Sequence, residues 1–223
     1  TGSIERPWQS IHQAMQSIPA EEDDATVVIR GGLYKIPQTI TFDAARGGSK
    51  NKYFTLMPYK DEEVVIDGSL LTQPFSSMVS LNATSYVRIK GLTFANLKGP
   101  KSAILIEGTS HHIRIINNKL QDMAWNPSSD DTQQGVMPSN SLNPIAVIGN
   151  HSKWPVNSIL IRGNLLSDIE LGHGGGIKII GNVTDFIVSQ NHAHNITNSG
   201  IVAAGNYAWI KDSSDPSVPL SKR

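Results

Sequence analysis

The segment SILIRGNLLSDI at residues 158–169 has three counterparts in the chain, YVRIKGLTFANL (86–97), HIRIINNKLQDM (112–123) and DFIVSQNHAHNI (185–196). Each is followed by a second short apolar segment: AILIEG (103–108), PIAVIG (144–149), GIKIIG (176–181) and GIVAAG (200–205). The four repeats start at intervals of 26, 46 and 27 residues. The longer interval is one ordinary repeat plus an insertion of about 20 residues, which we expect to be a surface loop.

The repeats predict stacked strands. Apolar and polar residues alternate within each repeat, which is the period of strands with one buried face. Asn118, Asn164 and Asn191 occupy the same position, just after the first strand of their repeats. Asparagine suits tight turns and can bond to its equivalents above and below, so we expect a stacked asparagine ladder. A repeat of this length with three short strands predicts an all-β protein, a right-handed parallel β-helix solenoid. A leucine-rich repeat would need a leucine consensus that the chain lacks.

This pattern resembles the pectate-lyase-like superfamily of right-handed parallel β-helix proteins. The opening segment RPWQSIHQAMQSIP (6–19) is similar to the helix that caps such solenoids, with Trp8, Ile11, Met15 and Ile18 on one face. We therefore expect a single domain over residues 1–223, with a capping helix at about 7–18, regular coils at about 53–209 and the inserted loop at about 124–143. The segment KDSSDPSVPLSKR (211–223) offers no cap, which predicts further coils beyond Arg223 or an oligomer; a closing loop is the alternative.

Composition limits the function. Lys plus Arg and Asp plus Glu both number 19 in 223 residues, so no net charge favours binding to nucleic acid. No run of 18 apolar residues exists, so no membrane-spanning helix is expected. The chain has no cysteine, which excludes disulfides and thiolate metal sites. The resemblance implies a secreted or periplasmic protein of bacterial type with a polysaccharide as its partner.

The same resemblance implies that substrate binds along the outer face of the sheet that contains GIKIIG. Alternation places Ile177 and Ile179 in the core and Lys178 on the outer face. Lyases that cleave uronates need a base of near-neutral pKa and a cation that neutralises the carboxylate. Lys178 with His173 nearby is the candidate pair, and Glu170 is a further catalytic candidate. The alternative is that Lys178 is a solvated surface lysine.

An acidic column suggests a second site. Asn96, Asp122, Asp168 and Asn195 end the third strand of successive repeats. Asp122 and Asp168 could bind Ca²⁺, a candidate cofactor, with Glu170 or with Asp130 and Asp131 of the insertion. Alternatively each residue bonds to its own turn, or two of the carboxylates form a glycoside hydrolase site.

Three further residues are candidates for substrate binding: Trp125, Lys101 and Glu107. An exposed Trp125 would stack on a sugar, whereas a buried one would only anchor its loop. Some β-helix proteins that this chain resembles carry acidic residues where it has Gly175 and Val202. The sequence favours a polysaccharide lyase that cleaves an acidic, uronate-containing polysaccharide by β-elimination. The alternatives are a glycoside hydrolase and a non-catalytic carbohydrate-binding or surface β-helix.

Overall fold

The computed structural model of the chain describes residues 2–20, 22–99, 101–125 and 141–205. These residues form one helix and three parallel six-stranded sheets. Sheet A contains, in spatial order, β1 (Thr26–Ile29), β4 (Phe54–Pro58), β7 (Ser85–Lys90), β10 (His111–Ile116), β13 (Val156–Arg162) and β16 (Val183–Ser189). Sheet B contains β2 (Gly32–Lys35), β5 (Val64–Asp67), β8 (Thr93–Ala95), β11 (Lys119–Ala124), β14 (Leu165–Glu170) and β17 (His192–Ile196). Sheet C contains β3 (Ile40–Phe42), β6 (Ser77–Asn82), β9 (Ser102–Glu107), β12 (Ile145–Gly149), β15 (Gly175–Gly181) and β18 (Ser199–Ala204).

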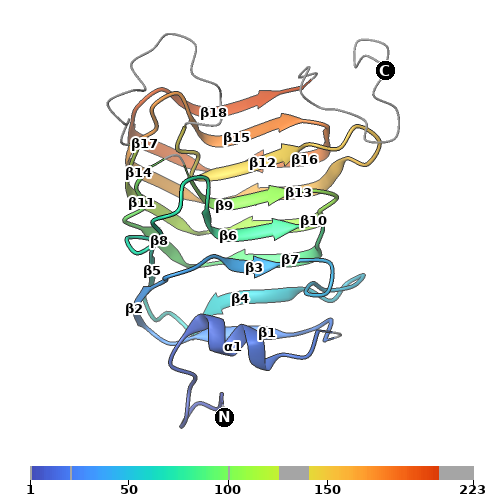
Figure 1. Cartoon of the computed structure of the whole chain (residues 1–223), viewed down its shortest axis with the longest axis vertical. Coiled ribbons are helices and arrows are strands. Elements are labelled where there is room, and N and C mark those ends of the chain that lie inside the picture. Colours follow the sequence, from blue (N-terminus) through green and yellow to red (C-terminus); the bar gives the residue numbers. More distant parts are fainter. Residues whose placement is uncertain (1, 21, 100, 126–140, 206–223) are drawn as a thin grey trace.

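Every strand pairs with the strand three places along the chain, so each turn of the chain adds one strand to each sheet. Figure 1 shows these turns stacked along the long axis, an arrangement consistent with a parallel β-helix solenoid. The predicted repeats correspond to the last four turns. The coils begin earlier than the predicted start near residue 53, because β1, β2 and β3 already form a complete turn. The segment between β3 and β4 has eleven residues (43–53), and β1, β2 and β3 are only three or four residues long, so the repeat is not evident in this part of the sequence.

The core is made of aligned apolar columns. Val87, Ile113 and Ile159 are partners in register on β7, β10 and β13, and each is at most 2% exposed. Burial of each such side chain contributes roughly 1.5–3 kcal/mol. The alternation that the sequence predicted therefore gives each sheet one face toward the core.

The asparagine ladder is confirmed. The Asn164 Oδ1 accepts hydrogen bonds from the backbone N–H and the side-chain amide of Asn118, at 3.0 and 3.1 Å. Asn191 Oδ1 accepts the corresponding bonds from Asn164, both at 2.9 Å. The side-chain amides of all three also donate to backbone carbonyls of sheet A, those of Ile89, Ile115 and Ile161. The ladder fixes the turn between sheets A and B on successive coils.

The N-terminal helix, α1 (Ile11–Ser17), is shorter than predicted. Ser10 caps it, since its hydroxyl accepts a hydrogen bond from the Gln13 N–H, and the residues before it are not helical. Ile11 and Met15 are buried, and α1 packs against β1 at the N-terminal end of the stack (Figure 1). Among the described residues, no helix has the length and apolar character needed to cross a bilayer.

Candidate functional site

The glycine-rich turn between β14 and β15 brings together two of the predicted site residues, Trp125 and His173. Gly172 has φ +63°, and a Cβ there would collide with the Trp125 indole, so only glycine fits this position without strain. The backbone N–H of Trp125 donates to the Glu170 carbonyl at 2.8 Å. The exposed His173 ring lies with its centroid 6.0 Å from that of Trp125. Trp125 is half-buried against the core, so it matches neither the fully exposed nor the fully buried alternative and presents part of its surface.

Lys178 lies on the outer face of sheet C, as predicted, but it is not solvated. Ile177 and Ile179 belong to the core, and the neighbours of Lys178 in register are Ala146 and Val202. Its exposure is only 8%, which contradicts the interpretation as a solvated surface lysine. Burial lowers the pKa of its ammonium, because a low-polarity environment disfavours the charged form. Among the described residues, no hydrogen bond or ion pair to its Nζ is found.

The acidic column lines a groove of about 440 Å³ at the ends of β11, β14 and β17. Asp122, Asp168 and Glu170 contribute the carboxylates, and Asn195 and Thr197 lie on the last of these strands or just after it. Gln121 Nε2 donates to the Asp122 carboxylate at 2.8 Å, and Asn195 Nδ2 donates to that of Asp168. The groove is therefore an acidic surface in which two carboxylates have amide partners.

The calcium interpretation gains no support from this geometry. Among the described residues, no three His, Asp or Glu side chains gather as metal ligands. Asp130 and Asp131 lie outside the described residues. The amide partner of Asp122 is the adjacent Gln121, and that of Asp168 is Asn195 on the next coil, so neither bond is the side-chain-to-backbone contact expected of a residue that closes its own turn.

Lys101 and Glu107, the other predicted substrate-binding residues, lie on or beside β9. Lys101 is buried, and its Nζ donates to the carbonyls of Leu71 and Lys98 at 2.6 and 2.8 Å. Burial lowers its pKa. These contacts give Lys101 a structural role that the sequence did not indicate. Burial raises the pKa of Glu107, whose carboxylate accepts a bond from the Asn82 amide at 3.4 Å.

The predicted site residues thus fall into separate sets. Trp125 and His173 meet at the glycine turn, and Asp122, Asp168 and Glu170 share the groove on sheet B. The groove's described lining includes neither Lys178 nor His173. The sequence analysis grouped Glu170 with Lys178 and His173 as catalytic candidates, whereas the structure places Glu170 beside the two aspartates on sheet B and Lys178 on sheet C.

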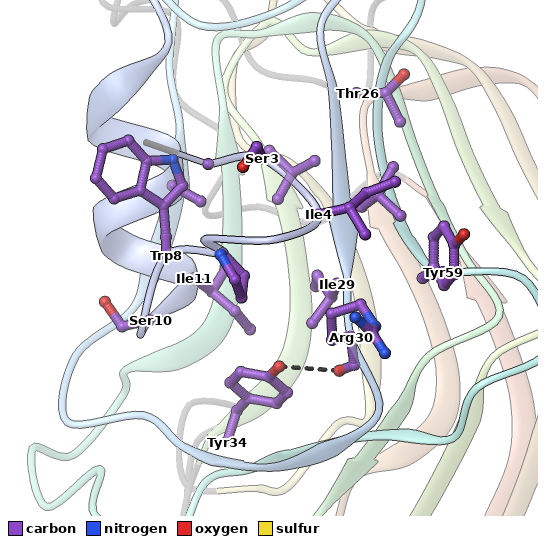
Figure 2. Close-up of a pocket in the computed structure, with 15 residues that line it drawn as sticks. Ser3, Ile4, Trp8, Ser10, Ile11, Thr26, Ile29, Arg30, Tyr34 and Tyr59 are labelled. Atoms are coloured by element: carbon purple, nitrogen blue, oxygen red, sulfur yellow. Dashed lines mark hydrogen bonds between the residues drawn. The ribbon is translucent and has the colours of Figure 1, made fainter.

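A pocket at the N-terminal end was not predicted. It has a volume of about 330 Å³, and Figure 2 shows Trp8, Tyr34 and Tyr59 around it, with Ile4 from the segment before α1. The Tyr34 hydroxyl donates to the Arg30 carbonyl at 2.9 Å (Figure 2). Arg30 forms an ion pair with Glu62 at 2.9 Å, so its charge is already compensated. The residues come from three separate segments, and no local motif in the sequence joins them.

Comparisons with known proteins give one curated relative. No family model matches the chain, and no solved structure matches it significantly. The chain is 27% identical over 221 residues to "Uncharacterized protein YwoF" of Bacillus subtilis (strain 168). The match covers 96% of this chain and 43% of that protein, so the chain spans less than half of the relative's length. The relative's name carries no activity, and the function is therefore argued from the site.

Proposed function

We propose that the chain is a right-handed parallel β-helix, closed at its N-terminal end by α1, and that it acts as a lyase on acidic, uronate-containing polysaccharides. The observation that carries the proposal is the buried amine of Lys178 on the outer face of sheet C, with its lowered pKa. A base for proton abstraction works best when its pKa approaches the working pH, and burial tunes lysine in that direction. The polysaccharide partner and the secreted or periplasmic location are likewise proposals, and they rest on the resemblance to the pectate-lyase-like superfamily.

The chemistry needs a base and an acid. Lys178 Nζ takes the proton from the sugar carbon that bears the carboxylate. The electron pair released forms a carbon–carbon double bond as the adjacent bond to the glycosidic oxygen breaks. His173, exposed beside Trp125, supplies the proton that this oxygen acquires, and the indole provides a surface for a sugar ring.

The test is incubation with pectate, alginate and glycosaminoglycans while the ultraviolet absorbance of the unsaturated product is followed. The rate should rise with pH through the lowered pKa of Lys178, below the value of about 10.4 of an ordinary lysine, because only the neutral amine accepts a proton. Lys178→Ala should lower kcat at least a hundredfold, within the usual contribution of a general base.

Two controls sharpen this test. Lys119→Ala removes an exposed lysine of β11 and should leave the rate unchanged. Lys178→Arg keeps a positive charge but removes the base, so it should also be inactive. An active Lys178→Arg enzyme would instead make this residue a clamp for the carboxylate, and no unsaturated product from any of these polymers would refute the lyase.

The acidic groove favours a second candidate, a glycoside hydrolase. It gathers Asp122, Asp168 and Glu170 in one sugar-sized space, and such enzymes use two carboxyl groups about 5–10 Å apart. New reducing ends without unsaturated product, lost in Glu170→Gln, would select it. Binding of glycans without turnover would select a non-catalytic role.

A further inference from the structure

The outer face of sheet A holds two adjacent arginines. Arg88 on β7 and Arg114 on β10 are partners in register, so their backbones are about 4.8 Å apart. Both guanidinium groups lie over the ring of Tyr53, with centroid distances of 4.7 and 4.4 Å. Tyr53 thus holds both cations on one small area of the sheet, where both are half-buried.

Nothing described neutralises these charges. The ion pairs found among the described residues are Arg30–Glu62 and Lys52–Asp23, and neither involves this pair. The next strands place uncharged residues in register, Thr55 on one side and Leu160 on the other. Like charges directly opposite each other on neighbouring strands are destabilising. A bound anion would offset the repulsion between these two arginines.

The excess of positive charge extends over sheet A. Its strands carry four Lys or Arg residues but one acid, Asp185, whereas the chain as a whole has 19 of each sign. The Asp185 carboxylate accepts a hydrogen bond from the Ser158 hydroxyl at 2.7 Å. The four basic residues are Arg88, Lys90, Arg114 and Arg162. Sheet A is therefore basic and the groove of sheet B acidic, although the net charge of the chain is zero.

Aromatic rings adjoin the arginines. Tyr86 and His112 are stacked, with centroids 4.4 Å apart and an interplanar angle of 20°. The Tyr86 ring also meets that of Tyr53 edge-on, at 5.7 Å. Arginine forks match carboxylate and sulfate groups, and aromatic rings pack against the apolar faces of sugars. One cluster therefore combines groups that can bind an anion with rings that can pack against a sugar; it consists of Tyr53, Tyr86, Arg88, His112 and Arg114.

We infer that this cluster is a binding site for an acidic glycan, separate from Lys178: Arg88 and Arg114 bind a carboxylate or sulfate group, and the Tyr86–His112 pair supports the sugar. The anion site stands on the geometry, and only the choice of a glycan rests on the proposed function. A nucleic acid fits less well, because its binding depends on many phosphate contacts, and two adjacent arginines provide few.

The experiment measures binding by calorimetry in a Lys178→Ala background, so that no substrate is consumed. The probes are an oligogalacturonate, a heparin-derived oligosaccharide, a neutral cello-oligosaccharide and a single-stranded DNA oligomer. We expect the Arg88→Gln/Arg114→Gln variant to weaken binding of an acidic oligosaccharide at least tenfold. Lys119→Gln, which removes a cation from sheet B, should change it less than twofold. The heparin fragment carries sulfate as well as carboxylate groups, so tighter binding of this probe than of the oligogalacturonate would indicate a contribution from sulfate.

Three outcomes would overturn the inference: equal affinity of the double variant for acidic oligosaccharides, equal binding of the neutral oligosaccharide, or tighter binding of DNA than of any glycan. Circular dichroism and thermal unfolding check that the double variant is folded, and each single variant should show a partial loss. Binding that depends on the arginines, together with no unsaturated product from the chain that retains Lys178, would refute the lyase and leave this site standing.

Discussion

Left-handed backbone conformations recur on each of the last four coils. Asn96, Asp122, Asp168 and Asn195 have φ between 50° and 59°. Tyr86, His112, Ser158 and Asp185 form a second such column on sheet A. Isolated residues of this kind often mark functional strain, but regular repetition along the stacked coils shows that the fold itself requires these bends. Asparagine and aspartate tolerate them better than other residues with a Cβ, which explains the composition of the first column.

This interpretation predicts different effects for two substitutions of Asp168. Asp168→Ala should lower the free energy of unfolding by about 1–2 kcal/mol, because alanine pays the full cost of a left-handed conformation and Asn195 loses its acceptor. Asp168→Asn should change it by less than about 0.5 kcal/mol, since Asn96 and Asn195 already occupy this column. Urea denaturation with and without calcium measures both. A loss in Asp168→Asn confined to calcium-containing buffer would instead establish a metal site.

At the scale of elements, the ladder turn joins sheets A and B through buried amides. Asn164 accepts two hydrogen bonds from Asn118 and donates to Asn191 and to the Ile115 carbonyl. Its side chain is only 1% exposed, so water cannot replace these partners. A buried polar group without a partner costs about 1–3 kcal/mol, which makes this turn a sensitive point of the stack.

We therefore expect Asn164→Ala to lower the free energy of unfolding by roughly 2–4 kcal/mol, because it leaves more than one buried group unpaired. Asn150→Ala is the matched control: this asparagine is exposed, and its change should stay within about 0.5 kcal/mol. Urea denaturation of both variants gives the comparison. Equal stabilities would show that the ladder contributes nothing beyond the packing around it.

The repeat pattern of the strands also determines which features of the fold and of the candidate site could be predicted from the sequence. The period and the shared position of Asn118, Asn164 and Asn191 suffice for the strands and the ladder of the last four coils, because each depends on neighbours at a fixed separation. Alternation also assigns Lys178 to the outer face, but it carries no information about what covers that face. The 8% exposure of Lys178 and the contact of Lys101 with the Leu71 carbonyl, which precedes the four repeats, could not be predicted from the repeat pattern. The Arg88–Arg114 pair was visible in YVRIK and HIRII, where both residues hold the same position.

At the scale of the molecule, the described coils form a one-dimensional stack in which each coil contacts the coils on either side. Ile145, Ile177 and Ile201 form one column of sheet C. The first two are at most 1% exposed, whereas Ile201 on the last described coil is 54% exposed. Phe186 shows the same change at the end of sheet A, at 39% exposed. In stacked folds, stability is approximately a sum of coil and interface contributions. Identical residues should therefore contribute different amounts to the free energy of unfolding at different places in the stack.

This difference can be measured with one substitution at two heights. Ile177→Ala should lower the free energy of unfolding by about 2–5 kcal/mol, because it opens a cavity inside the stack. Ile201→Ala should cost less than about 1 kcal/mol, since its side chain is already half in water and little apolar area is lost. Urea unfolding of both variants, at several protein concentrations, separates the two effects. An equal cost at Ile201 would show that further protein covers the last described coil, and a cost that grows with protein concentration would identify that cover as a second copy of the chain.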